Sequence, residues 1–228
     1  FLHQLQTLEK QSTAQKPPLQ QSHNVQTLSF KQVQLHTVDG QALLDIDHKV
    51  LNDDYRMTVI KGASGIGKST LFKMLAGLHL HFTGEVALPT GKLMFLPQRA
   101  YFPVGGLLSA VAYPQIATDG DEPRLVHAMG LVGFHGQHIQ TMLHACDFSK
   151  LSGGEQQRLM IARVIFNQPD WVFLDESCNA LDEETEQKMF ALLQEQLPNT
   201  RVVLISHTNN TEAAPDSEEW QLSHTKFA

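Results

Sequence analysis

A glycine-rich stretch in the first third of the chain has the residue types and spacing to hold a phosphate chain. Residues 62–70 read Gly-Ala-Ser-Gly-Ile-Gly-Lys-Ser-Thr and fit the pattern G-x-x-x-x-G-K-[ST]. The glycines let the backbone turn tightly and aim N–H groups at an anion. Lys68 can neutralise the β- and γ-phosphates, and the Ser69 hydroxyl can bind Mg²⁺. We expect the whole stretch to line a nucleoside triphosphate site: Gly62, Ala63, Ser64, Gly65, Ile66, Gly67, Lys68, Ser69 and Thr70.

The residues on either side of this phosphate loop predict the elements that must position it. Residues 57–60 form a short apolar run, which is typical of a buried strand. Leu71, Leu75 and Leu78 recur on one face of a helix that should end near Gly77. A glycine-rich turn can match the pattern by accident. A strand before it and an amphipathic helix after it favour phosphate binding.

Two carboxylates follow another apolar run. Residues 171–174 fit a central parallel strand, and Asp175 stands at its carboxyl end, where open α/β sheets place their ligand sites. Asp175 can hold Mg²⁺ through water, and Glu176 is suited to polarise an attacking water as a general base. An Asp-Glu pair after a strand also occurs at helix N-terminal caps, and alone it supports both interpretations equally. Together with the phosphate loop it favours catalysis.

The stretch Leu151-Ser152-Gly153-Gly154-Glu155 points to one family. With the phosphate loop ahead of it, the chain resembles an ATP-binding-cassette (ABC) ATPase domain over about residues 25–225. Ser152, Gly153 and Gly154 precede a predicted amphipathic helix at residues 155–166, and a small hydroxyl with bare N–H groups at a helix start is an anion site. In the family this site serves the ATP of the opposite subunit. The resemblance therefore implies a head-to-tail dimer.

The resemblance also implies roles for two residues that end further apolar strands. Gln98 resembles the family's Q-loop glutamine, near Mg²⁺ and the attacking water, and His207 resembles the switch histidine that contacts the γ-phosphate. Residues 179–182 correspond to the D-loop. An isolated Gln or His at a strand end is usually an ordinary polar residue, but their order along the chain favours function. The implied catalytic residues are Glu176, His207 and Gln98, the implied Mg²⁺ ligands are Ser69, Gln98 and Asp175, and the implied cofactors are ATP and Mg²⁺.

The chain departs from the family pattern at two places. Many members stack adenine on an aromatic residue in the first strand, where this chain has Thr37 with His36 beside it. We therefore expect weak stacking, by His36 or by a residue from elsewhere. After the two carboxylates the chain has Ser-Cys-Asn where Ala-Thr-Ser is usual, and because these residues are small we expect catalysis to survive.

The expected fold class is α/β: a P-loop NTPase core with a mostly parallel sheet, an antiparallel β-subdomain and a small helical subdomain. Residues 27–37 alternate apolar and polar, Asp39 and Gly40 predict a hairpin turn, and residues 42–50 predict the returning strand. Residues 101–150 would form the helical subdomain, with helices near 105–112 and 122–131.

Composition agrees with one folded core. The 228 residues are 42% hydrophobic and 18% charged, which are globular values. A net charge of −7 gives no reason to expect a nucleic-acid partner. Cys146 and Cys178 are expected to be thiols in a reducing compartment, and the twelve histidines show no strong zinc spacing. We expect no signal peptide in this stretch, and it contains no apolar run of the roughly 18–20 residues that span a membrane.

Residues 1–24 predict a linker: residues 1–8 are helix-like, and residues 11–24 are polar with a Pro-Pro pair. We expect this linker to be the remnant of a helix from an upstream membrane domain. The alternative for these residues is a tag or a frayed terminus. The ABC ATPase domain is expected at residues 25–228. Residues 95–101, with Gly105 and residues 112–114, resemble half-transporters of the YddA and SbmA/BacA-related type and the peroxisomal fatty-acyl transporters. In that branch the ATPase follows the membrane domain on one chain.

Three functions compete on this basis. The first is the ATPase motor of a membrane transporter, at the cytoplasmic face of the inner membrane, with a transmembrane domain and a second copy as partners. The second is an ABC ATPase that acts on DNA or the ribosome, but those usually carry long insertions or two cassettes. The third is a non-catalytic nucleotide-binding module, which would lack the base or the switch residue, whereas Glu176 and His207 are both present. The transporter motor is favoured, and its substrate would be selected by the membrane domain.

Overall fold

The computed structural model describes residues 19–21, 27–51, 54–144, 146–175, 183–205 and 217–223, in which nine strands form two sheets. The strands are β1 (Leu19–Gln21), β2 (Leu28–His36), β3 (Ala42–Leu51), β4 (Met57–Lys61), β5 (Phe82–Leu88), β6 (Leu93–Leu96), β7 (Trp171–Asp175), β8 (Arg201–Ile205) and β9 (Ser217–Gln221). The helices are α2 (Lys68–Leu75), α3 (Leu107–Ala112), α4 (Glu122–Leu131), α5 (Gly136–His144), α6 (Gly153–Asn167) and α7 (Glu183–Gln196), with short 3-10 turns η1 (Asp119–Asp121) and η2 (Phe148–Lys150).

Five parallel strands form the central sheet, in the order β6-β7-β8-β4-β9. Both faces of this sheet are covered, and alternate residues of one strand therefore enter different cores. Val172 and Leu174 of β7 belong to a cluster with α3, α4, α6 and α7. Trp171 and Phe173 belong to a second cluster with α2 and the other sheet. Burial on both faces explains why the strands are continuous apolar runs, and it confirms the predicted α/β fold with a mostly parallel sheet.

The second sheet has the order β1-β5-β2-β3. Its β2 and β3 pair antiparallel across a turn at Asp39 and Gly40, which confirms the predicted hairpin. At its edge β1 pairs in parallel with β5, with Leu19 opposite Val86. Residues 19–21 fall in the segment that the sequence predicts to be a linker, and this sheet therefore includes a strand from that segment.

The alternation of β2 is interrupted by a bulge. Phe30 and Val33 are both buried, three residues apart, and Gln32 between them has a left-handed backbone with φ of 49°. Opposite this point β5 carries Gly84, with φ of 90°. A Cβ atom on Gly84 would lie 2.2 Å from the Gln32 carbonyl oxygen, so only glycine fits there.

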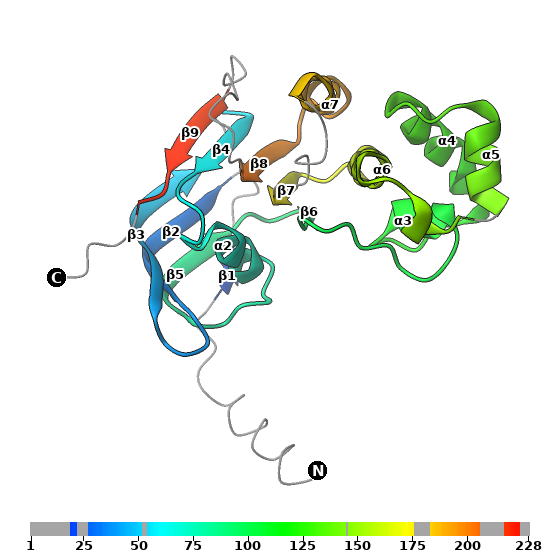
Figure 1. The fold of residues 1–228 in the computed structure, drawn as a ribbon. Coiled ribbons are helices and arrows are strands. Elements are labelled where there is room, and N and C mark those ends of the chain that lie inside the picture. The colour runs from blue at the N-terminus through cyan, green and yellow to red at the C-terminus, as the bar shows by residue number, and fades with distance from the viewer. Residues whose placement is uncertain are drawn as a thin grey trace, which may run out of the picture.

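Helices cover the two faces of the central sheet unequally. The predicted helix after the phosphate loop is α2, where Leu71 and Leu75 are buried. Leu78 does not extend this buried face: α2 ends at Leu75, and the Leu78 side chain is 79% exposed. On the other face α6 is central, and α3, α4 and α5 gather beyond it at the end of the molecule opposite the β1-β5-β2-β3 sheet (Figure 1). The sequence predicts α3, α4 and α6 closely, but not α5 or α7. Among the described residues no helix is both long and apolar enough to cross a bilayer.

Candidate functional site

The phosphate loop connects β4, which lies between β8 and β9, to α2. Gly65 and Gly67 take left-handed backbone conformations, with φ of 80° and 104°. These conformations need glycine and let the loop turn into α2, whose first hydrogen bond runs from the Leu71 N–H to the Gly67 carbonyl at 2.8 Å. The start of α2 thus presents backbone N–H groups to the space enclosed by the loop.

The Lys68 side chain folds back onto the start of the phosphate loop. Its ammonium donates to the carbonyl oxygens of Gly62 at 2.7 Å and Ala63 at 3.1 Å, and the residue is only 4% exposed. A buried charge of this kind is costly unless it is well hydrogen-bonded, and two carbonyl dipoles compensate it in part. The loop therefore holds a positive charge against its inner wall, where phosphate oxygens would neutralise it.

Ser69 and Asp175 are brought together from distant parts of the chain. The Ser69 hydroxyl, in the first turn of α2, donates to Asp175 Oδ1 at 2.9 Å, across 106 residues of sequence. Asp175 is the last residue of β7, and β8 separates β7 from β4. A hydroxyl and a carboxylate at hydrogen-bond distance are the hard oxygen ligands that Mg²⁺ prefers. These residues fit a magnesium ion bound beside a triphosphate.

The remaining predicted catalytic residues follow neighbouring strands. Gln98 lies two residues beyond β6 and is exposed, and Leu96 of β6 is in register with Leu174 of β7. Gln98 therefore belongs to the same carboxyl edge of the sheet as Asp175. Glu176 directly follows β7 and His207 comes two residues after β8, but both lie outside the described residues, as do the residues of the D-loop.

Ser152, Gly153 and Gly154 form the start of α6. The Ser152 hydroxyl accepts a bond from the Glu155 N–H at 3.3 Å, and the Glu155 carboxylate accepts from the Ser152 N–H at 2.9 Å, which is a capping box. Hydrogen bonds from Ser152 lower the pKa of the Glu155 carboxyl below its usual value. Helix α6 packs in one core cluster and α2 in the other, on opposite faces of the parallel sheet. The two predicted anion sites of one chain are therefore carried on different sides of the sheet.

The end of the hairpin contains Thr37, the position at which the sequence analysis expected an aromatic residue. The Thr37 hydroxyl accepts a bond from the Gln41 N–H at 3.0 Å and closes the turn. Two histidines that the sequence analysis did not single out lie next to it: the His79 ring is 2.8 Å from the His36 carbonyl oxygen and 5.5 Å from the His81 ring. The sequence feature that could have pointed to these two histidines is the His-Leu-His triplet at residues 79–81, just after α2.

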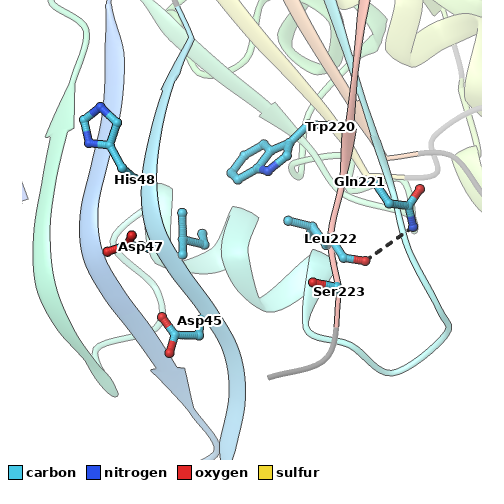
Figure 2. A pocket seen from close by; sticks show the side chains of 8 residues that line it. Asp45, Asp47, His48, Trp220, Gln221, Leu222 and Ser223 are labelled. Carbon is cyan, nitrogen blue, oxygen red and sulfur yellow. Dashed lines mark hydrogen bonds between the residues drawn. The ribbon is translucent and has the colours of Figure 1, made fainter. Parts of the chain in front are cut away.

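Strand β9 supports the base of the phosphate loop, which the sequence analysis also missed. The Leu222 N–H donates to the Lys61 carbonyl at 2.8 Å, and the Leu222 carbonyl oxygen lies 3.0 Å from where a Cβ on Gly62 would be. Beside it, a pocket of about 240 Å³ lies between β3 and β9 (Figure 2). The pocket is lined by Asp45, Ile46, Asp47, His48, Trp220, Gln221, Leu222 and Ser223. None of the predicted site residues lines it.

Comparisons with known proteins agree with this geometry. The family model described as ABC transporter matches residues 51–179. An uncharacterized ABC transporter ATP-binding protein of Haemophilus influenzae is 34% identical over 89% of this chain and 35% of its own length. The inner membrane ABC transporter ATP-binding protein YddA of Escherichia coli is 28% identical over 86% of this chain and 35% of its own length. This chain thus spans about a third of the length of these relatives.

The fold is also similar to solved structures. A bacterial Atm1-family ABC exporter with ATP bound superposes with a TM-score of 0.74 at 20% identity, over 96% of this chain and 43% of the exporter chain. At that identity the likeness concerns the fold alone.

Proposed function

Because this chain belongs to the ABC transporter family, we propose that it is an ATP-binding and ATP-hydrolysing motor domain. It works as a head-to-tail dimer and couples hydrolysis to transport by a membrane domain. The observation that carries this proposal is the 2.9 Å hydrogen bond between Ser69 and Asp175. It joins the phosphate loop to the carboxyl edge of the sheet, where a magnesium-bound triphosphate and an attacking water can be held together.

The loop binds the triphosphate through charge and backbone N–H groups. Lys68 exchanges its carbonyl partners for β- and γ-phosphate oxygens, and N–H groups at the start of α2 bind the same oxygens. Ser69, Asp175 and Gln98 would supply oxygen ligands for Mg²⁺, directly or through water. When bound, the ion would neutralise charge on the phosphate oxygens. Hydrolysis itself is assigned to the side chains that follow strands β6, β7 and β8.

Hydrolysis requires a base at the edge of β7. Glu176 accepts a proton from water, whose oxygen attacks the γ-phosphorus while the bond to the β–γ bridging oxygen breaks. Gln98 orients the water, and His207 donates to the γ-phosphate. ADP and inorganic phosphate are the products.

The second half of the site comes from another copy of the chain. The start of α6 and the start of α2 belong to opposite faces of the sheet, which supports a head-to-tail arrangement. In that arrangement Ser152, Gly153 and Gly154 of one copy close over the γ-phosphate held by the other. The Ser152 hydroxyl and the bare N–H groups provide the contacts.

The rest of the molecule follows from this role. Residues 25–228, together with strand β1 at residues 19–21, act as the ATPase domain, with residues 101–150 as its helical subdomain and a membrane domain on the same native chain as its partner. The relative YddA is named an inner membrane protein. We place the site of action at the cytoplasmic face of the inner membrane, with the transported molecule selected by the membrane domain.

The proposal is tested at the residue pair that carries it. Ser69→Ala removes the hydroxyl ligand but leaves the loop N–H groups and Lys68 in place. We expect ATP affinity measured by calorimetry with Mg²⁺ to fall about tenfold, roughly 1.4 kcal/mol. Without Mg²⁺ the affinity of the variant should match that of the wild type. An equal loss with and without Mg²⁺ would show that Ser69 does not serve the metal.

A further inference from the structure

A stacked pair of phenylalanines joins two segments of the proposed ATPase site. Phe102 lies four residues after Gln98, and Phe148 lies four residues before Ser152. Their rings stack with centroids 4.7 Å apart and planes 17° from parallel. Both side chains are half-buried and pack against the core cluster that contains α6. The stack therefore links the segment after β6 to the segment that leads into α6.

Arg163, in the middle of α6, holds Phe102 in place. Its guanidinium donates to the carbonyl oxygens of Ala110 at 2.9 Å and Tyr101 at 2.8 Å, and lies 5.4 Å from the centre of the Phe102 ring. Arg163 is 4% exposed, and burial lowers its pKa to about 10, so the group stays charged at neutral pH. Cation–π contact and carbonyl bonds thus fix the Phe102 segment to the body of α6.

The segment before α6 is held on two sides. The Gln156 side-chain amide, on the first turn of α6, donates to the carbonyl oxygens of Leu151 at 3.0 Å and Phe148 at 3.4 Å. The Phe102 ring contacts the same segment through Phe148. The residues that precede Ser152, the N-cap residue, restrain the position of its backbone. The direction in which this helix start points therefore depends on both attachments.

We propose that Phe102 and Phe148 are positioning residues that orient Ser152, Gly153 and Gly154 for closure over the nucleotide held by a second copy of the chain. The inference rests on the proposed function. Neither ring belongs to the phosphate loop, whose helix α2 packs in the other core cluster. Loss of the stack should therefore affect closure between two copies and leave nucleotide binding by one copy unchanged.

Leucine substitutions in a Glu176→Gln background test this proposal. Phe102→Leu and Phe148→Leu keep an apolar side chain but remove the stacked rings. We expect MgATP affinity by calorimetry, measured with Ser152→Arg added so that no dimer forms, to change less than about twofold. Without Ser152→Arg, nucleotide-dependent dimerisation should weaken roughly fivefold to a hundredfold, because each dimer contains two stacks. The double variant should be no worse than the single ones, since they break the same contact. Phe102→Trp, which restores a ring, should recover dimerisation.

Phe95→Leu is the matched control. It removes a half-buried ring from another stacked pair, with Phe173 at 4.5 Å and 8°, which packs in the opposite core cluster. Dimerisation of this control should equal that of Glu176→Gln. Unchanged dimerisation in Phe102→Leu and Phe148→Leu, or additive losses in the double variant, would overturn the positioning role.

Hydrogen exchange separates this inference from the proposed function, because it needs no nucleotide. The amides of Glu155 and Gln156, which are hydrogen-bonded to Ser152, should exchange at least about threefold faster in Phe102→Leu, from the loss of one aromatic contact, and at the parent rate in Phe95→Leu. If Glu176→Gln failed to bind MgATP or to dimerise with it, the proposed function would be wrong. Equal exchange rates in the variant and the parent would instead contradict the role of the stack itself.

Discussion

At the scale of single residues, two polar groups of the proposed site already have hydrogen-bond partners within it. The Lys68 ammonium lies inside the loop on two carbonyl oxygens, and the Ser69 hydroxyl lies on Asp175. Both groups can therefore change partners without large movements of the backbone. A preorganised loop of this kind loses little conformational entropy when a triphosphate binds. We expect phosphate recognition to dominate affinity, and recognition of the base to contribute less.

Base selectivity should be weak because Thr37 offers no ring. ATP and GTP are expected to bind the wild type within about tenfold of each other, roughly 1.4 kcal/mol, in calorimetry with Mg²⁺. Thr37→Tyr should tighten the binding of both by roughly fivefold, since stacking is worth about 1 kcal/mol. A preference for ATP far above tenfold would mean that His36 or another ring recognises adenine. His36→Ala in the same assay would show whether His36 or another ring recognises adenine.

At the scale of elements, the bulge in β2 shapes the sheet that carries the hairpin. Buried side chains change from even to odd positions across Gln32, at Phe30 and then Val33. Without the extra residue, every side chain after it would turn to the opposite face. The pairing of β2 with β5 skips at the same place, between Lys31 and Gln34. The close approach of Gly84 to Gln32 is what permits the bulge.

Gly84→Ala should be among the most destabilising single changes in this sheet. The added Cβ would meet the Gln32 carbonyl oxygen at 2.2 Å, and backbone atoms cannot yield without breaking the bulge. We expect a loss of more than about 3 kcal/mol in urea unfolding. Gly40→Ala is the matched control: it has φ of 82° but nothing within 4 Å, and should lose only about 1 kcal/mol. Equal losses of stability in the two variants would show that the left-handed backbone, and not the contact between residue 84 and Gln32, determines the cost of the substitution.

At the scale of the whole molecule, the parallel sheet separates the two predicted anion sites. The phosphate loop leads into α2 on one side, and Ser152 starts α6 on the other, each within its own core cluster. Both clusters are continuous with the sheet, so the separation is built into the fold. Under the proposed function, a complete site requires two copies, and we expect nucleotide to control their association.

The Glu176→Gln variant is expected to reveal this association. It keeps size and hydrogen bonding but loses the base, which typically costs about 10²–10⁴-fold in hydrolysis rate. Uncleaved MgATP should then hold two copies together, and light scattering should report a monomer without nucleotide and a dimer with it. Adding Ser152→Arg should abolish the dimer, whereas Ser149→Arg, on an exposed residue before the helix, should not. Hydrolysis at the wild-type rate would exclude Glu176 as the base.

Much of the fold and part of the site could be predicted because the signals are local. The loop at residues 62–70, the strand ending at Asp175 and the hairpin around Asp39 and Gly40 each lie within a few residues of sequence. Periodicity, glycine spacing and turn chemistry act over that range. The predicted helices at 105–112 and 122–131 correspond to α3 and α4 for the same reason. Leu78 shows where periodicity fails: the helix had ended at Leu75.

The tertiary structure alone decided which distant residues meet. Ser69 reaches Asp175 across 106 residues, Phe102 stacks on Phe148, and β1 adds to β5. These contacts depend on strand order, on crossover connections and on how helices fill the two faces of the sheet, none of which leaves a periodic trace in the sequence. The chain's residue types determined which chemistry is available. Long-range packing placed the two proposed half-sites, at the starts of α2 and α6, on different sides of the sheet, because a parallel sheet covered on both faces keeps these helices apart.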